Sequence, residues 1–453
     1  MSTIVSISTA PGIGGIGIIR MSGEKSFEIL DKIFKPKTSQ KIEDIKGYTI
    51  KYGHIVENNE IIDEVLVSYF KAPRSYTTEN MCEINSHGGN VVVKKILEIC
   101  LKNGAELAEP GEFTKRAFLN GRIDLAQAES VIDVINAKSD KEAKSGIKQL
   151  EGYLSKEIKG IKQEILDVLV NIEVTIDYPE YDTPEVQEKE IAQMLESVGK
   201  KLKKLEKSFD NGKIIKDGIK TAIIGKPNAG KSSLLNAILK EDRAIVTDIA
   251  GTTRDTIEEF VTINGIPLNL VDTAGIREAS DEVEKIGVEK SIKQANDADL
   301  IIAIFDSSKD LEEEDIEILN LIKGKKSIIL LNKSDLNSKI DDRFTSITEN
   351  ILRISALNKY GIDELYEKIA ELFNLNEINL DNEILITNIR HKNIISKSLE
   401  NVNKAKEALE INMPIDIITI YIKEILEDLG EITGEVVTED IINEIFSKFC
   451  LGK

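Results

Sequence analysis

Residues 225–232 read GKPNAGKS, the spacing G-x-x-x-x-G-K-[ST] of a phosphate-binding loop. The apolar segment 221–224 precedes the loop, and a helix is expected to begin near Ser232. Glycines let backbone N–H groups turn toward phosphate oxygens, and a helix N-terminus adds a positive dipole. Lys231 would reach the β- and γ-phosphates, while Ser232 would ligate Mg²⁺. The strand–loop–helix context disfavours the alternative, a plain turn that contains glycine.

Two further segments could read the base of a nucleotide. Residues 332–335 read NKSD and follow the apolar strand 327–331. The Asp335 carboxylate could accept two parallel hydrogen bonds from guanine N1–H and N2–H₂, a donor pair that adenine lacks. Residues 355–357 read SAL and stand where GTPases place their last base-contacting loop.

Two segments could close on the γ-phosphate. Residues 272–275 read DTAG, where Asp272 would hold Mg²⁺ through water and the Gly275 N–H would meet the phosphate. Residues 251–255 read GTTRD and form a candidate switch loop in which Thr253 could close on Mg²⁺. Each short match is weak alone. In this order along the chain they predict a guanine-nucleotide domain.

Ile276 departs from the Ras-type pattern, in which a glutamine orients the attacking water. Isoleucine cannot polarise water, so the catalytic group must come from elsewhere. Glu284 is the candidate. Its alternative interpretation is an ordinary solvated acid on a helix face.

The length of 453 residues predicts two to four domains. No segment is long and apolar enough for a membrane span, and the N-terminus does not resemble a signal peptide. Cys82, Cys100 and Cys450 form no metal-binding or disulfide spacing, which suits a reducing cytoplasm. We therefore expect a cytoplasmic protein without membrane contact.

The net charge of −20 argues against general affinity for nucleic acid. Residues 1–119 carry 15 basic and 15 acidic side chains, so the whole net negative charge lies in residues 120–453. A nucleic-acid contact would need a local basic patch or a partner protein.

The first 119 residues mix strands with a helix. We expect a helix at 91–103 and strands at four segments: 3–8, 17–21, 48–56 and 64–71. Residues 12–17 match G-x-G-x-x-G, but a strand follows where a dinucleotide-binding fold requires a helix. A glycine-rich bend is expected instead.

The pattern becomes helical from about residue 120. One apolar stripe runs from 147 to 172, and a second runs from 191 to 209. The nucleotide domain follows, and helical pattern returns after residues 374–383. We therefore expect one helical domain into which the nucleotide domain is inserted, because such stripes need partners to bury against.

The chain ends FCLGK at residues 449–453. Thr438 is expected to cap the final helix and to leave the last residues as a mobile terminus. Cys450 has two interpretations, a buried or inert thiol, or a reactive thiolate whose pKa a neighbour such as Lys453 lowers.

Together these features resemble the tRNA-modification GTPases called MnmE or TrmE, over the full chain. The most specific matches are the segments 120–129, 225–233, 247–255, 272–284 and 450–453. The resemblance implies an α/β and α multidomain fold. Its parts would be an N-terminal α/β tetrahydrofolate-binding domain, a helical domain in two segments, and an inserted Ras-like α/β P-loop GTPase domain. The expected bounds are 1–119 for the first, 120–216 and 377–453 for the second, and 217–376 for the third.

The resemblance also implies an activity. It is GTP hydrolysis coupled to adding an aminomethyl- or carboxymethylaminomethyl-type group to C5 of the wobble uridine in certain tRNAs. The implied cofactors are K⁺, Mg²⁺ and 5-formyl-tetrahydrofolate or a related one-carbon folate. The implied partners are tRNA, a second copy of the chain in a homodimer through the N-terminal domains, and the flavoprotein MnmG in a heterotetramer.

Matching the family motifs position by position assigns the sites. The folate contacts would be Arg20, Glu83, Arg122 and Lys453, although the family often carries lysine where this chain has Arg122. The K⁺ ligands would be Asn228, Thr247, Ile249 and Thr252, and the Mg²⁺ ligands Ser232 and Thr253. Glu284 matches the water-orienting glutamate, and Cys450 is the second candidate catalytic residue. The expected GTP-binding set is Asn228, Ala229, Gly230, Lys231, Ser232, Ser233, Thr247, Asp248, Ile249, Ala250, Gly251, Thr252, Thr253, Asp272, Thr273, Ala274, Gly275, Asn332, Lys333, Asp335, Ser355, Ala356 and Leu357.

Two other functions remain open at this stage. A ribosome-assembly or signalling GTPase would explain the nucleotide domain equally well, but it predicts a basic RNA-binding module and no folate site. A GTP-dependent scaffold would fit the long helices but not the folate-type residues.

Overall fold

The computed structural model describes residues 2–37, 47–177, 184–239, 259–270, 295–336, 343–344, 346–376 and 383–453. The chain divides into two compact units. Unit 1 comprises Met1–Ile132, Lys148–Leu202 and Ile394–Lys453, and unit 2 comprises Asp133–Ile147 and Lys203–Asn393. Within the described residues, no helix is long and apolar enough to cross a membrane.

Unit 1 begins with a seven-stranded sheet in the order β3-β4-β5-β6-β2-β1-β7. Its strands are β1 (Ile4–Ile7), β2 (Ile16–Ser22), β3 (Phe34–Pro36), β4 (Thr49–Glu57), β5 (Glu60–Phe70), β6 (Met81–His87) and β7 (Glu106–Leu107). All neighbours are antiparallel except β1 and β7. The four strands expected from the sequence are present, whereas β6 was not predicted. A strand follows the glycines at 12–17, as expected.

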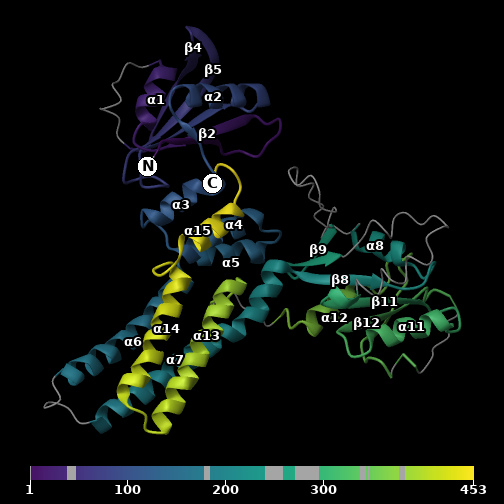
Figure 1. Cartoon of the computed structure of the whole chain (residues 1–453). Coiled ribbons are helices and arrows are strands. Elements are labelled where there is room, and N and C mark those ends of the chain that lie inside the picture. Colours follow the sequence, from purple (N-terminus) through teal and green to yellow (C-terminus); the bar gives the residue numbers. More distant parts are fainter. Residues whose placement is uncertain are drawn as a thin grey trace. The chain divides into compact units, whose positions relative to one another are not determined.

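Helices α1 (Ser26–Ile33) and α2 (Asn90–Lys102) cover this sheet (Figure 1). Ile29 of α1 and Ile96 of α2 share one buried cluster with Ile19 and Ile84 of the sheet. The sheet therefore buries one face against the two helices.

Among the residues that the structure describes, the helical part of the chain comprises eight helices. They are α3 (Glu112–Leu119), α4 (Leu125–Asn136), α5 (Asp140–Leu150), α6 (Tyr153–Asp177), α7 (Pro184–Asp217), α13 (Ile389–Glu410), α14 (Ile415–Thr433) and α15 (Glu439–Ser447). Figure 1 shows α6, α7, α13 and α14 side by side. In unit 1, Lys201 of α7 pairs with Glu164 of α6, and Lys406 of α13 pairs with Glu196 of α7.

The expectation of one continuous stripe from 147 to 172 is wrong. Helix α5 ends at Leu150 and α6 begins at Tyr153. Gly152 between them has φ +83°, a left-handed conformation that terminates a helix. The apolar spacing runs through this break because both helices bury one face, so spacing alone did not reveal it.

The expectation of a mobile C-terminus is also wrong. Thr438 is the N-cap residue of α15, but its side chain makes no capping hydrogen bond. Beyond α15, Phe449 is buried, and the Phe113 N–H donates to the carbonyl of Lys453 at 3.2 Å. The tail is therefore held against the N-terminal part of unit 1.

Unit 2 contains a six-stranded sheet in the order β13-β12-β11-β8-β10-β9. Its strands are β8 (Ile219–Ile224), β9 (Glu259–Ile263), β10 (Ile266–Leu270), β11 (Leu300–Asp306), β12 (Ser327–Asn332) and β13 (Ile351–Arg353). All neighbours are parallel except the β9–β10 hairpin. This is the strand–helix alternation expected of the nucleotide domain.

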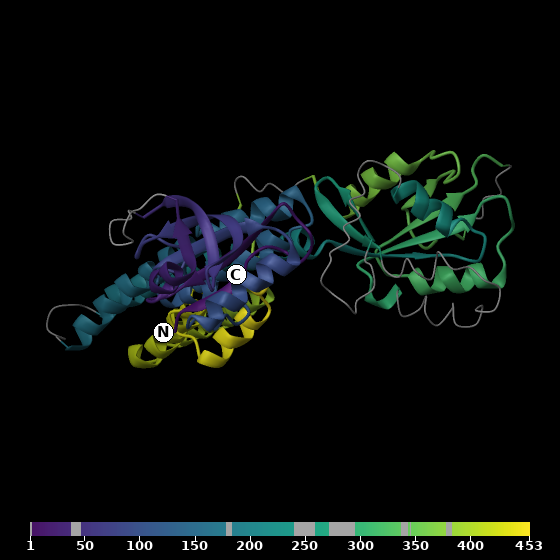
Figure 2. The same cartoon turned by 90° about the horizontal axis from the view of Figure 1, so that it is seen from above.

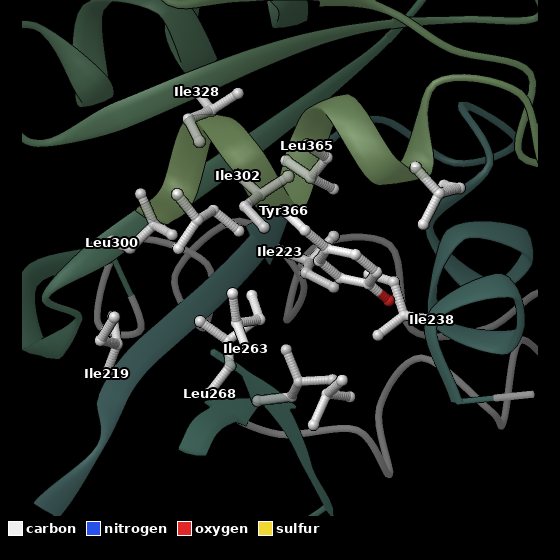
Figure 3. Packing of buried hydrophobic residues seen from close by; sticks show 14 of the residues in the cluster. Ile219, Ile223, Ile238, Ile263, Leu268, Leu300, Ile302, Ile328, Leu365 and Tyr366 are labelled. Carbon is white, nitrogen blue, oxygen red and sulfur yellow. The ribbon is translucent and has the colours of Figure 1, made fainter. Parts of the chain in front are cut away.

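Helices cover both faces of this sheet (Figure 2). Helices α8 (Lys231–Leu239) and α12 (Ile362–Leu372) pack on one face, where Ile223, Leu365 and Tyr366 lie in one core (Figure 3). Helix α11 (Glu313–Ile322) packs on the other face through Leu319. In such sheets, ligands bind beyond the carboxyl ends of the parallel strands, where β8, β11 and β12 end here.

Candidate functional site

The loop 225–232 joins β8 to α8. Asn228 and Gly230 have φ values of +63° and +109°, both left-handed. A Cβ on Gly230 would lie 2.1 Å from Nδ2 of Asn332, and one on Gly225 would lie 2.5 Å from the carbonyl oxygen of Ile304. Both glycines are therefore required by close packing as well as by the turn.

Lys231 is the first residue of α8, and its side chain lies over the preceding loop. Its Nζ donates to the carbonyl oxygens of Gly225 at 2.6 Å and Lys226 at 2.8 Å. Burial lowers the pKa of Lys231. A phosphate would offer this ammonium stronger, charge-assisted acceptors than two carbonyls, so the arrangement fits phosphate binding.

One buried side chain joins three of the predicted segments. Asn332 Nδ2 donates to the carbonyl oxygen of Ala229 at 2.8 Å, and the Ala356 N–H donates to Asn332 Oδ1 at 3.0 Å. Asn332 is 3 % exposed. The sequence predicted Asn332 as a nucleotide contact, but it did not predict this bridging role.

The predicted base-reading residues also come together. Ser355 Oγ donates to Asp335 Oδ1 at 2.6 Å, which fixes the carboxylate at the end of β12. Lys333 has φ +62°, and its Nζ pairs with Asp306 Oδ2 at 2.6 Å. Burial opposes the charge of Asp306, but hydrogen bonds from Lys333 and Ser308 outweigh burial and lower its pKa. Leu357, the third residue of the segment at 355–357, is exposed.

Lys226 is a residue of this loop whose role the sequence did not reveal. Its Nζ pairs with Asp315 Oδ2 at 2.6 Å and with Glu312 Oε2 at 2.7 Å. Burial works against the charge of Lys226, but the two carboxylates raise its pKa above the usual value. The phosphate-loop pattern allows any residue at this position, so no sequence signal could have found the pair.

A cavity of about 260 Å³ lies between the loop and the start of α11. Lys226, Asn228, Asp306 and Asp315 are among its lining residues. Asn228, the predicted K⁺ ligand of the loop, therefore faces open space beside the phosphate-binding turn.

The remaining residues that the sequence predicts for nucleotide binding and hydrolysis lie outside the described residues. These are Thr247, Asp248, Ile249, Ala250, Gly251, Thr252, Thr253, Asp272, Thr273, Ala274, Gly275 and Glu284. Their roles stay predictions.

A second cluster of predicted site residues lies in unit 1. Arg20 of β2 lies opposite Glu83 of the neighbouring strand β6. Arg20 Nε donates to Glu83 Oε1 at 2.9 Å, and Arg20 Nη2 lies 2.8 Å from the same oxygen. Two guanidinium groups lie over the ring of Tyr76, with centroid distances of 5.5 Å to Arg20 and 4.5 Å to Arg122. Neither Tyr76 nor its role was predicted from the sequence.

The C-terminal tail completes this cluster. The Gly452 carbonyl accepts hydrogen bonds from Ser8 Oγ at 3.0 Å and Arg20 Nη1 at 3.3 Å. Burial, and then the Arg20 charge, lower the pKa of Lys453. The four predicted folate contacts thus gather from four distant parts of the sequence. Their two guanidinium groups and one ammonium group face one carboxylate, an excess of positive charge that fits an anionic ligand.

The three cysteines differ sharply in surroundings. Cys82 and Cys100 are buried, and burial raises the pKa of Cys100 to about 12 and that of Cys82 well above its usual value. Cys450 is exposed at the tail, so the interpretation of a buried thiol is wrong for it. Its exposure leaves the thiol accessible to reagents.

Comparisons with known proteins bear on the whole chain. The family model described as GTP-binding protein TrmE N-terminus matches residues 3–122, and the model described as MnmE helical domain matches residues 125–450. The tRNA modification GTPase MnmE of Acetivibrio thermocellus is 51% identical over 459 residues, covering 100% of this chain and 99% of that protein. The MnmE of Clostridioides difficile is 51% identical over 454 residues with the same coverage. The chain belongs to the MnmE (TrmE) family of tRNA-modification GTPases.

Solved structures are similar to part of this MnmE-family chain. The G domain of the T. maritima FeoB iron transporter is 30% identical, with a TM-score of 0.25, over 34% of this chain and 98% of that chain. Era of Aquifex aeolicus is 29% identical, with a TM-score of 0.27, over 40% of this chain and 65% of that chain.

Proposed function

We propose that this chain, a GTPase of tRNA modification by its family, acts on C5 of the wobble uridine together with the flavoprotein MnmG. The observation that carries the proposal is the second cluster. A nucleotide switch alone has no use for a tail that packs beside Arg20 and Glu83 and carries Lys453 and an exposed thiol. A one-carbon folate, which is anionic and has a donor edge for the Glu83 carboxylate, would supply the carbon unit there.

The nucleotide site supports GTP as the substrate. Lys231 would exchange its two carbonyl acceptors for the β- and γ-phosphates, and Ser232 would ligate Mg²⁺. Asp335, held by Ser355, would accept from guanine N1–H and N2–H₂. Glu284 would orient the attacking water, because Ile276 cannot.

K⁺ and Mg²⁺ fit the donors of this site. Both are hard cations that take oxygen ligands, and a magnesium ion in such a site is held by one or two side chains and the phosphates. The Asn228 amide oxygen, with Thr247, Ile249 and Thr252, would hold K⁺. The positive charge supplied there would offset charge that develops on the phosphates during hydrolysis.

The proposed assembly is a homodimer through the N-terminal domains that forms a heterotetramer with MnmG. Dimerisation can be measured by sedimentation of the full chain, and the complex by co-sedimentation with MnmG. A strictly monomeric chain that still supports modification would contradict this part of the proposal.

Mass spectrometry of the wobble uridine tests the central proposal. A deletion strain should lack the C5 group, and the wild-type chain should restore it. A Cys450→Ser strain should restore GTP turnover but not the C5 group if the thiol is catalytic. Normal modification in the deletion strain would overturn the proposed function, and a fully modified Cys450→Ser strain would remove only the role of the thiol.

We expect GTP hydrolysis to be faster in K⁺ than in Na⁺, and Asn228→Ala to abolish the difference. The reason is that Ile276 stands where a glutamine would act, so the cation must supply part of the stabilisation. Steady-state turnover in KCl and NaCl at matched ionic strength measures it. Equal turnover of the wild-type chain in the two salts would contradict the expectation.

A further inference from the structure

The side chain of Lys226 reaches from the phosphate loop to the start of α11. Its Nζ lies 2.6 Å from Asp315 Oδ2 and 2.7 Å from Glu312 Oε2. The side chains of Lys226 and Asp315 are 16% and 7% exposed, whereas that of Glu312 is largely exposed. The pair with Asp315 is therefore the better shielded of the two, and shielding from water strengthens a charge-assisted bond of this length.

The backbone of Lys226 lies at the centre of the hydrogen bonds within the same loop. Its carbonyl oxygen accepts from Lys231 Nζ at 2.8 Å and from the Ala229 N–H at 3.3 Å. The first donor is the group expected to reach the phosphates, and the second belongs to the turn whose N–H groups would surround them. Lys226 therefore contacts α11 through its side chain and the phosphate-binding groups through its backbone.

The Asp315 carboxylate is itself held in place by α11. The Glu312 N–H donates to Asp315 Oδ2 at 2.9 Å, and this is the same oxygen that Lys226 contacts. That hydrogen bond belongs to the capping box of the first helical turn, and Leu319 packs the same helix against the sheet. A carboxylate fixed in this way gives the Lys226 ammonium group one preferred position.

The segment between β11 and α11 also contacts the base-reading part of the nucleotide site. Asp306, the last residue of β11, lies 2.6 Å from Lys333 Nζ, and the Ser307 N–H donates to the Asn332 carbonyl oxygen at 2.9 Å. This segment is thereby fixed at its start by residues 332–333 and at its end by the capping box of α11. Its acids form ion pairs with a lysine of the phosphate loop and with a lysine of the base-reading segment.

Open space lies beside the pair of Lys226 and Asp315. The cavity of about 260 Å³ is lined by residues 226–229 of the loop and, from the segment before α11, by Asp310 and Leu311. Lys226 and Asp315 both line it, so their ion pair joins two of its walls. Because side chains across open space make fewer close contacts, packing contributes less to holding the loop here and the ion pair contributes more.

We propose that Lys226 is a positioning residue for GTP hydrolysis, whose ion pair with Asp315 holds the phosphate loop in the conformation that the transition state requires. The inference rests on the proposed role of the loop in binding the phosphates, and it adds the contact that orients the loop. Preorganised N–H groups and a fixed ammonium group stabilise developing charge best, because they need no rearrangement at that moment. A loop released from α11 would still bind GTP through its base and phosphates, but with poorer alignment for the reaction.

Steady-state GTP hydrolysis by the full chain tests the proposal, with turnover counted per nucleotide site. Titration with labelled GDP counts the competent sites, so that unfolded molecules do not enter kcat. Lys226→Met should lower kcat and kcat/KM together by about 10- to 100-fold, while KM for GTP changes by less than about threefold. Lys226→Arg keeps a cation that can reach both carboxylates, and it should recover most of the lost turnover. Lys309→Met removes an exposed lysine that lines the same cavity, and this matched control should keep wild-type turnover.

Asp315→Asn tests the same contact from the side of α11. The amide keeps an oxygen that can accept from the Glu312 N–H, but it removes the charge that Lys226 requires. This variant should lower kcat per site to a similar extent as Lys226→Met. The double variant should lower kcat no further than either single variant, because both changes remove one ion pair. If Lys226→Met gives no titratable sites, Asp315→Asn supplies the same comparison.

Wild-type kcat per site in Lys226→Met or in Asp315→Asn would overturn the proposal, because the pair would then serve only the stability of unit 2. An equal loss in Lys309→Met, or no recovery in Lys226→Arg, would overturn it as well. Lys231→Ala separates this inference from the one on which it rests. If Lys231→Ala binds GTP as tightly as the wild-type chain, the proposed phosphate site fails and the positioning role fails with it. If it loses GTP while Lys226→Met keeps wild-type turnover, only the positioning role fails.

Discussion

Single residues of the predicted nucleotide site also hold its separate segments together. Asn332 joins the phosphate loop to the segment at 355–357, and Gly230 must lack a side chain to let Asn332 approach. The residue types were recognised from spacing, because each short motif is local. The hydrogen bonds between motifs were not, because they join positions 103 and 24 residues apart in the chain.

Asp335→Asn should weaken GTP binding by about 10- to 100-fold, because the base loses a charged acceptor for its amine. It should also relax discrimination toward xanthosine triphosphate, whose carbonyl can accept from the new amide. Competition titration with both nucleotides measures the preference. Asp363→Asn, an exposed acid on α12, is the matched control. An unchanged preference for GTP would remove the base-reading role from Asp335.

At the scale of elements, an ion pair links the start of α11 to the phosphate loop. Asp315 closes the capping box of this helix with Glu312 and also accepts from Lys226. One carboxylate therefore holds the start of the helix and the loop together. The apolar spacing of the sequence predicts the helix itself. The ion pair between Lys226 and Asp315 depends instead on the parallel pairing of β8 and β11, which brings the ends of both strands together.

Lys226→Met should lower the free energy of unfolding of unit 2 by about 1–3 kcal/mol, because the nearly buried Asp315 carboxylate loses its partner. Glu312→Gln should change it little, since that side chain is 68% exposed. Chemical denaturation followed by loss of GDP binding reports on this unit. If the two variants are equally stable, the tie between Lys226 and Asp315 contributes nothing to the fold.

At the scale of the whole molecule, the C-terminal end of the chain packs against its N-terminal end. The final residues pack beside β1, and Gly452 lies so close that a Cβ would be 2.2 Å from the carbonyl oxygen of Ile7. Gly452 also has φ +88°. The second cluster in unit 1 therefore exists only once both ends of the chain have met.

Gly452→Ala should displace the tail, because the added methyl group meets backbone and the φ value is strained. Folate binding, measured by titration with 5-formyl-tetrahydrofolate, should weaken, while GTP turnover should remain near that of the wild-type chain. Gly104→Ala is the control, since Gly104 has φ +105° but open space at its Cβ. Equal folate affinity in both variants would show that the tail does not contribute to that site.

The sequence by itself determined the nucleotide domain, its guanine preference and the insertion into helical segments, because loop spacing and apolar periodicity are local properties. The resemblance of the sequence motifs to known GTPases indicated the family, and the comparisons confirmed it. Only the tertiary structure decided that α5 and α6 are separate helices, that Lys226 holds α11, and that the tail is held in place. Each of these depends on backbone conformation or on contacts between distant segments, which neither composition nor spacing records.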